Sequence, residues 1–113
     1  MPSQKRSGNF RIAAPSRKLL DALGEYLGLA NAPLIELLIR QAHRGEIPRP
    51  DALFQRWHDN AGITEPFNRR LSGRGLEMLA EVAAGWSLSQ SDLVEYLIFY
   101  RAVFEGLAIP RRP

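Results

Sequence analysis

Two short segments of the chain place an asparagine and an arginine two residues apart, in Asn9-Phe10-Arg11-Ile12-Ala13 and Phe67-Asn68-Arg69-Arg70-Leu71-Ser72. Alternate side chains of a β-strand share one face. If Ile12 and Leu71 face a core, the opposite face carries Asn9, Arg11, Ala13, Asn68, Arg70 and Ser72. Arginine and asparagine suit bidentate hydrogen bonding to guanine and adenine edges, so we predict that these six residues contact DNA bases. The alternative is that they only solvate an exposed strand.

The basic residues gather in three short segments. Residues 1–18, 69–74 and 111–113 hold 10 of the 15 lysines and arginines and none of the 12 acidic residues, although the net charge of the 113-residue chain is only +3. Such a distribution is typical of a polyanion-binding face on an otherwise acidic protein. The alternative is that the basic ends only promote solubility.

Little in the sequence indicates catalysis. The chain has no cysteine, and its two histidines, His43 and His58, are isolated in the sequence, so each is expected to be a solvated or packed side chain and not a ligand or base. The pair His58-Asp59 lacks the further partner and nucleophile of a catalytic triad. We therefore predict no enzyme activity, no catalytic residues, no metal site and no cofactor. No apolar run approaches the length of a membrane span and no signal peptide is evident, so we expect a cytoplasmic protein without membrane contacts.

Apolar spacing and capping residues predict five helices. The first has Pro15 in its first turn and ends at Gly28, and the second runs from Pro33 to His43 or Arg44. Asp51 is the expected N-cap of a short helix. A fourth helix follows Gly73-Arg74-Gly75, two glycines that should loosen its start, and a fifth follows a capping box of Ser89 and Asp92. The aromatic residues at helical spacing are expected in the core, with an oligomer surface as the alternative for the last three: Trp57, Trp86, Phe99, Tyr96, Tyr100 and Phe104.

The second half of the chain repeats the first. Residues 9–39 align with residues 68–98 without a gap, and the alignment matches eight identical pairs, among them Asn9 with Asn68, Arg11 with Arg70 and Glu36 with Glu95. Each unit is too small to form a core alone, and its single strand needs the strand of the other unit. We predict a mainly α-helical fold with a two-stranded antiparallel ribbon. The expected segments are a flexible basic arm (1–8), unit one (9–44), a linker with a short helix (45–66), unit two (67–105) and a basic tail (106–113).

The order strand, helix, turn, helix resembles the ribbon-helix-helix superfamily of the Arc and MetJ repressors. The resemblance is carried by Asn9-Phe10-Arg11-Ile12 leading through Pro15 into the first helix, and by Gly28-Leu29-Ala30-Asn31 before the second. Two units in one chain are similar to the TraY-type relaxosome proteins of conjugative plasmids. The resemblance implies a tandem pseudo-dimer whose ribbon enters the major groove, while the second helix of each unit holds a phosphate at its N-terminus.

Phosphate contacts are expected from basic side chains and from helix N-termini, which present free N–H groups. Arg69, which takes the place of Phe10 in the second unit, departs from the apolar residue expected there and is predicted to bind phosphate. Pro33 removes one donor from the first N-terminus, so we expect the second to bind more tightly; the alternative is that Ser89 only caps its helix. The complete set is Lys5, Arg6, Arg17, Lys18, Asn31, Arg69, Arg74, Ser89, Gln90 and Ser91.

The expected function is sequence-specific binding of double-stranded DNA. The sequence leaves open whether the protein is a transcriptional repressor or an accessory factor of plasmid conjugation, and it does not give the target sequence. This hypothesis allows additional partners: further copies of the protein on DNA, and a relaxase or another protein. The alternative is a protein-interaction module, antitoxin-like or an adaptor, that keeps the fold without reading bases.

Overall fold

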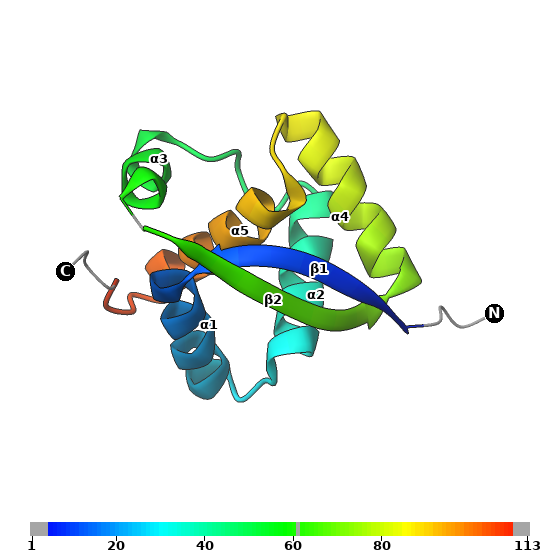
Figure 1. Ribbon diagram of the computed structural model, residues 1–113, viewed down its shortest axis with the longest axis horizontal. Helices are drawn as coiled ribbons and strands as arrows, with labels where there is room; N and C mark the ends of the chain where they lie inside the picture. Colours follow the sequence, from blue (N-terminus) through cyan, green and yellow to red (C-terminus); the bar gives the residue numbers. More distant parts are fainter. Residues whose placement is uncertain (1–4, 61, 110–113) are drawn as a thin grey trace.

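A two-stranded sheet lies across one side of the molecule, and the helices pack behind it (Figure 1). The computed structural model describes residues 5–60 and 62–109. Its elements are β1 (Lys5–Ala13), α1 (Ala14–Leu27), α2 (Asn31–His43), α3 (Ala52–Asp59), β2 (Thr64–Ser72), α4 (Gly73–Trp86) and α5 (Gln90–Phe104). The predicted class, mainly α-helical with a two-stranded antiparallel sheet, is confirmed.

The register of the sheet decides which side chains reach the core. Asn9 lies directly opposite Asn68, and Phe10 lies opposite Phe67. Because facing residues of an antiparallel pair share a face, alternation separates two sets along both strands. Buried against the helices are Phe10, Ile12, Phe67 and Leu71, whereas Asn9, Arg11, Asn68 and Arg70 are exposed. The predicted alternation is confirmed at these eight positions.

Both strands begin earlier than predicted. Residues 5–8 belong to β1, not to a flexible arm, and residues 64–66 belong to β2, not to the linker. The pairing explains both corrections: residues 5–8 lie opposite residues 69–72, and residues 64–66 lie opposite residues 11–13. Each extension satisfies backbone N–H and C=O groups of the other strand, which a single strand leaves without partners. The rest of the predicted arm, residues 1–4, and residues 110–113 of the tail lie outside the described residues.

Three helices begin or end at the capping residues that the sequence predicted. Gly28 ends α1 in the left-handed conformation, at φ 70°. The Asp51 carboxylate accepts hydrogen bonds from two backbone N–H groups at the start of α3, and the Ser89 hydroxyl accepts one from Asp92 at the start of α5.

Among the described helices, none alone is long and apolar enough to cross a membrane; α1 and α2 meet that criterion only as a pair bent by 92°.

The segment between the two halves contributes to the core through α3. Phe54 is buried, and its ring centroid lies 5.0 Å from that of Tyr96 and 5.5 Å from that of Phe99, both on α5. Trp57 also packs against Phe99, at 4.8 Å between centroids. As a result α5 is covered on more sides than α2. The predicted core position is confirmed for Tyr96 and Phe99, but it is wrong for Phe104, which is 68% exposed near the end of α5.

The register predicts opposite outcomes for two carboxylates introduced into β2. Leu71 is 0% exposed, so Leu71→Asp would bury an unpaired charge and should cost several kcal/mol, a large part of the stability of a domain of this size. Asn68→Asp places the same group on the exposed face and should melt within a few degrees of the wild type. Circular dichroism melts of the two variants test this. If Asn68→Asp unfolded and Leu71→Asp did not, the assignment of the two faces would be inverted.

Candidate nucleic-acid interface

The exposed face of the sheet carries a symmetric row of polar side chains. At its centre Asn9 and Asn68 lie opposite each other. Arg11 follows two residues further along β1, and Arg70 follows two residues further along β2 in the opposite direction. At a rise of about 3.3 Å per residue, the two arginines are separated by about 13 Å along the strands. This order, arginine, asparagine pair, arginine, brings together four of the six predicted base-contacting residues.

Each arginine of the row is anchored on the neighbouring strand. Arg11 donates from Nε to Thr64 Oγ1 at 3.2 Å and from Nη2 to the Thr64 carbonyl at 2.9 Å. Arg70 donates from Nη2 to the Lys5 carbonyl at 3.4 Å. When the alignment of the two halves is extended, Lys5 aligns with Thr64. The contacts of Arg11 and Arg70 are therefore counterparts in the repeat. Since a guanidinium has five N–H donors, each side chain is oriented and keeps donors for a ligand.

The two asparagines differ in their local partners. Ser7 donates its hydroxyl hydrogen to Asn9 Oδ1 at 2.9 Å, which leaves the amide NH2 of Asn9 as its donor group toward a ligand. The counterpart of Ser7 in the repeat is Pro66, which has no hydroxyl. The two halves of the row therefore present related but unequal hydrogen-bonding groups.

The last residue of each strand does not extend the row. Ala13 is 1% exposed, so its predicted outward position and base contact are wrong. Ser72 is half-buried, and its hydroxyl accepts a hydrogen bond from the backbone N–H of Gly75 at 2.9 Å, as the N-cap of α4. The physical reason is the same at both sites: the strand turns directly into a helix, so its last residue takes the N-cap position and strand alternation ends there.

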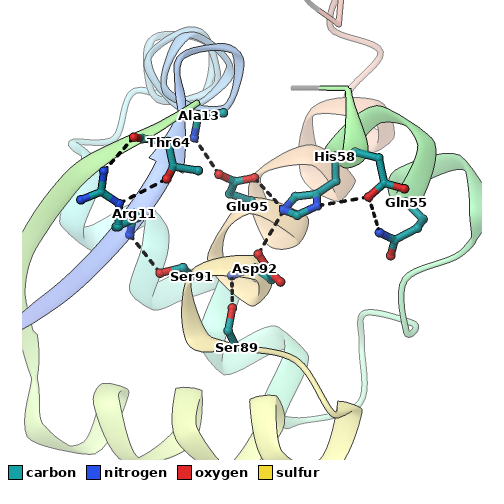
Figure 2. A network of polar contacts seen from close by, with 10 residues as sticks. Arg11, Ala13, Gln55, His58, Thr64, Ser89, Ser91, Asp92 and Glu95 are labelled. Atoms are coloured by element: carbon teal, nitrogen blue, oxygen red, sulfur yellow. Dashed lines mark hydrogen bonds and ion pairs between the residues drawn. The ribbon is translucent and has the colours of Figure 1, made fainter. Parts of the chain in front are cut away.

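Two carboxylates fix these strand ends. The Ala13 N–H donates to Glu95 Oε1 at 2.7 Å, and the Ser72 N–H donates to Glu36 Oε1 at the same distance. Glu36 and Glu95 are an identical pair of the repeat, and each accepts from the strand of the other half of the chain. Figure 2 shows the contact at Glu95, between the end of β1 and α5. The row is therefore held at both ends by hydrogen bonds between the two halves.

Gly75 makes room for one of these carboxylates. A Cβ atom at position 75 would lie 2.6 Å from Glu36 Oε1 and 3.0 Å from Ser72 Oγ. Gly75 is buried, and its lack of a side chain allows the Glu36 carboxylate to reach the end of β2, a role that the sequence did not indicate.

His58 is joined to the same region and is not isolated as the sequence indicated. Its Nε2 lies 3.0 Å from Asp92 Oδ1 and 3.3 Å from Glu95 Oε2, and Figure 2 shows the imidazole between α3 and α5. Glu95 is 1% exposed, and this burial raises the pKa of its carboxyl, although the Ala13 N–H and His58 oppose that effect. Sequence spacing gave no signal of this cluster, since α3 and α5 meet only in the folded chain.

The two helix N-termini predicted to bind phosphate have different surroundings. At α5 the hydroxyls of Ser89 and Ser91 accept hydrogen bonds from the backbone N–H groups of Asp92 and Arg11. Asp92 also places a carboxylate in the first turn, which disfavours an anion there, and Gln90 is exposed. At α2 the side chain of the N-cap residue accepts no hydrogen bond from the backbone of the first turn. That turn has no acidic residue, and Asn31 is half-buried. The carboxylate of Asp92 and the serine contacts weaken the case for an anion at α5, while Pro33 still removes one donor at α2, so the predicted order stays a prediction.

The two strands of the ribbon carry a strong excess of positive charge. Strands β1 and β2 together carry Lys5, Arg6, Arg11, Arg69 and Arg70 and a single carboxylate, Glu65. Among the other predicted phosphate-binding residues, Lys18 is exposed on α1, and Arg17 lies 3.6 Å from Asp21. Arg74 lies 3.4 Å from Glu77 on α4, so part of its charge is balanced.

Comparisons with protein-family models, with curated proteins and with solved structures found no match to this chain. The functional assignment therefore rests on the arrangement and charge of the ribbon. Among the described residues, no group of three or more acidic or histidine side chains is arranged to hold a metal ion.

The raised pKa of Glu95 predicts a pH-dependent contribution to stability. An unfolded glutamate releases its proton at about pH 4.3, whereas the folded protein retains it to higher pH. The stabilisation is therefore complete below the unfolded pKa and is lost as the pH rises through the folded pKa. Glu95→Gln does not ionise, so its melting temperature relative to the wild type should increase as the pH rises above the unfolded pKa of about 4.3. A relative melting temperature that fell over this range would contradict the assignment.

Proposed function

We propose that the chain is a tandem pair of ribbon-helix-helix units, folded as a pseudo-dimer, that binds double-stranded DNA sequence-specifically with its ribbon in the major groove. The observation that carries the proposal is the exposed row of Arg70, Asn68, Asn9 and Arg11 on a paired, basic ribbon. The B-DNA major groove admits a two-stranded ribbon. The row supplies the side-chain types that read base edges there.

Contacts that recur at equivalent positions of the two halves support the tandem interpretation. The guanidinium bonds from Arg11 to Thr64 and from Arg70 to Lys5 form one such pair. A second pair joins each carboxylate of the repeat to the strand end of the other half, as described above for Glu36 and Glu95. The centre of the register falls on the equivalent residues Asn9 and Asn68. These contacts are the ones that an approximate two-fold axis through the middle of the ribbon would produce, and they support the proposal in that sense.

The spacing of the row suits base pairs. The two arginines are about 13 Å apart along the strands, which corresponds to about four base-pair steps of about 3.4 Å. Arg11 and Arg70 would each pair with a guanine, and the two asparagines would contact the bases between them. Basic side chains beside the row, such as Lys5, Arg6 and Lys18, would attract phosphates of either strand. Such a protein could act as a transcriptional repressor or as an accessory factor of conjugation, and a relaxase or further copies on DNA are the partners to test.

The proposal is tested by selection from randomised DNA duplexes, followed by fluorescence anisotropy of the selected and scrambled duplexes at two salt concentrations. We expect a selected motif of two guanine-containing half-sites and an affinity that falls steeply with salt for both duplexes. Absent binding, or binding with no preference for the selected duplex, would overturn the proposal and favour the protein-interaction alternative.

Alanine variants should separate base reading from phosphate attraction. Arg11→Ala or Arg70→Ala should cost about 1 to 3 kcal/mol of binding and relax the preference at one base position. Lys5→Ala and Arg6→Ala are matched controls on the same ribbon and should weaken binding to all duplexes by similar factors. All four side chains are exposed, so the melting temperatures should change little. Equal losses by Arg11→Ala on selected and scrambled DNA would refute its role in base reading.

The pseudo-dimer also predicts that the protein is folded as a monomer, because both strands of the ribbon belong to one chain. Size-exclusion chromatography with light scattering should give the mass of one chain without DNA, and the unfolding midpoint should not depend on protein concentration. A midpoint that continued to fall on dilution to nanomolar protein would instead indicate folding between chains.

A further inference from the structure

Two arginines converge on one aromatic ring at the inner side of the ribbon. The Arg69 guanidinium carbon lies 3.9 Å from the centroid of the Phe67 ring, and that of Arg17 lies 5.2 Å from the same centroid. Arg69 belongs to β2 and Arg17 to α1, so this group, which we call the Phe67 site, lies where the ribbon meets α1. Both cations are accessible, since Arg69 is half-buried and Arg17 is exposed.

The equivalent place in the other half of the chain is apolar. The counterparts of Arg69 and Arg17 in the repeat are Phe10 and Leu76. There the Phe10 ring fills the space beneath Gly8, where an added Cβ atom would lie 2.7 Å from the ring and 3.2 Å from a Leu76 methyl group. At equivalent positions of the repeat, one half therefore has a phenylalanine and a leucine, and the other half has two arginines.

The two cations have few partners to offset their mutual repulsion. Burial and the charge of Arg17 both lower the pKa of Arg69, and Asp21 only partly opposes them. Asp21 lies 3.6 Å from Arg17, while Arg69 donates Nη1 to the carbonyl of its own neighbour, Asn68, at 2.7 Å. In the other half, Gly8 is the counterpart of Phe67 and leaves room for the Phe10 ring, so the two places are packed differently and only this one carries cations. An anion between them would relieve the repulsion.

We propose that the Phe67 site binds a phosphate group of the DNA backbone through Arg17 and Arg69, on one side of the ribbon only. This inference rests on the proposed function. Guanidinium groups bind phosphate oxygens through paired, charge-assisted hydrogen bonds, and stacking on an aromatic ring holds them in place. Because the apolar counterpart at Phe10 and Leu76 has no cation, this contact gives the complex a direction. The protein then binds a target with two similar half-sites in one orientation.

Neutral side chains of similar length supply the test variant. The double substitution Arg17→Gln and Arg69→Gln removes both charges, and because neither arginine is fully buried it should melt within a few degrees of the wild type. On the selected duplex, the slope of log affinity against log salt should become shallower by about one unit, since one phosphate contact is lost. The base preferences selected by the row should not change. Arg44→Gln removes a cation at the far end of α2 and is the matched control, with an unchanged slope.

A second measurement locates the phosphate. Duplexes in which single phosphates are replaced by neutral methylphosphonates should weaken wild-type binding at one position beside only one half-site, and the double variant should be insensitive to that replacement. If the double variant proves unstable, the single variants Arg17→Gln and Arg69→Gln keep the test open, because each removes one charge and retains a polar side chain of similar length. Equal sensitivity at both half-sites would overturn the one-sided contact.

Titration with inorganic phosphate distinguishes the source of the anion and separates the two proposals. If the selected duplex binds with an unchanged salt slope in the variants, the inference is wrong and the proposed function stands. Shifts of the Arg17 and Arg69 Nε–H resonances with inorganic phosphate alone, together with that unchanged slope, would identify a site for free phosphate and overturn the DNA contact. If the wild type binds no duplex, the proposed function and the inference that rests on it both fail.

Discussion

The antiparallel pairing of β1 and β2 is the interaction on which the other features depend. Each strand is the only partner of the other in the described sheet, and the two are separated in the sequence by three helices. A one-residue slip of β2 against β1 would turn Leu71 toward water and bring Arg70 against the helices. The same pairing that buries the apolar side chains therefore sets the exposed row, and the core and the interface cannot change register independently.

Two glutamates explain why this register is held at its ends. Glu36 and Glu95 each reach from a helix of one half to the last strand residue of the other half. Glu95 is buried and Glu36 is half-buried, a carboxylate removed from water is costly unless it accepts hydrogen bonds, and a backbone N–H at a strand end needs an acceptor. Each group meets the requirement of the other. Gly75 belongs to the same arrangement, since a side chain there would collide with the Glu36 carboxylate.

The two halves of the chain differ where additional contacts are made. Helix α3 buries Phe54 against α5, and His58 of the same helix joins Asp92 and Glu95. Helix α2 has no equivalent cover among the described residues. Along the ribbon, Ser7 and Pro66 occupy equivalent places but only the serine can orient an asparagine. The two halves of the sequence repeat therefore share some contacts and differ in others, such as those of Phe54, His58 and Ser7.

Much of this arrangement was determined by the local sequence. Alternation around Ile12 and Leu71 predicted the face of Asn9, Arg11, Asn68 and Arg70, because strand periodicity is a local property. Capping at Gly28, Asp51 and Ser89 was predicted for the same reason. Only the tertiary structure decided the features that need two distant segments: the full length of each strand, set by the partner opposite it, the burial of Ala13, the role of Gly75, and the contacts of His58 and Arg69. Such features depend on distances between segments, which residue types and spacing along one chain do not specify.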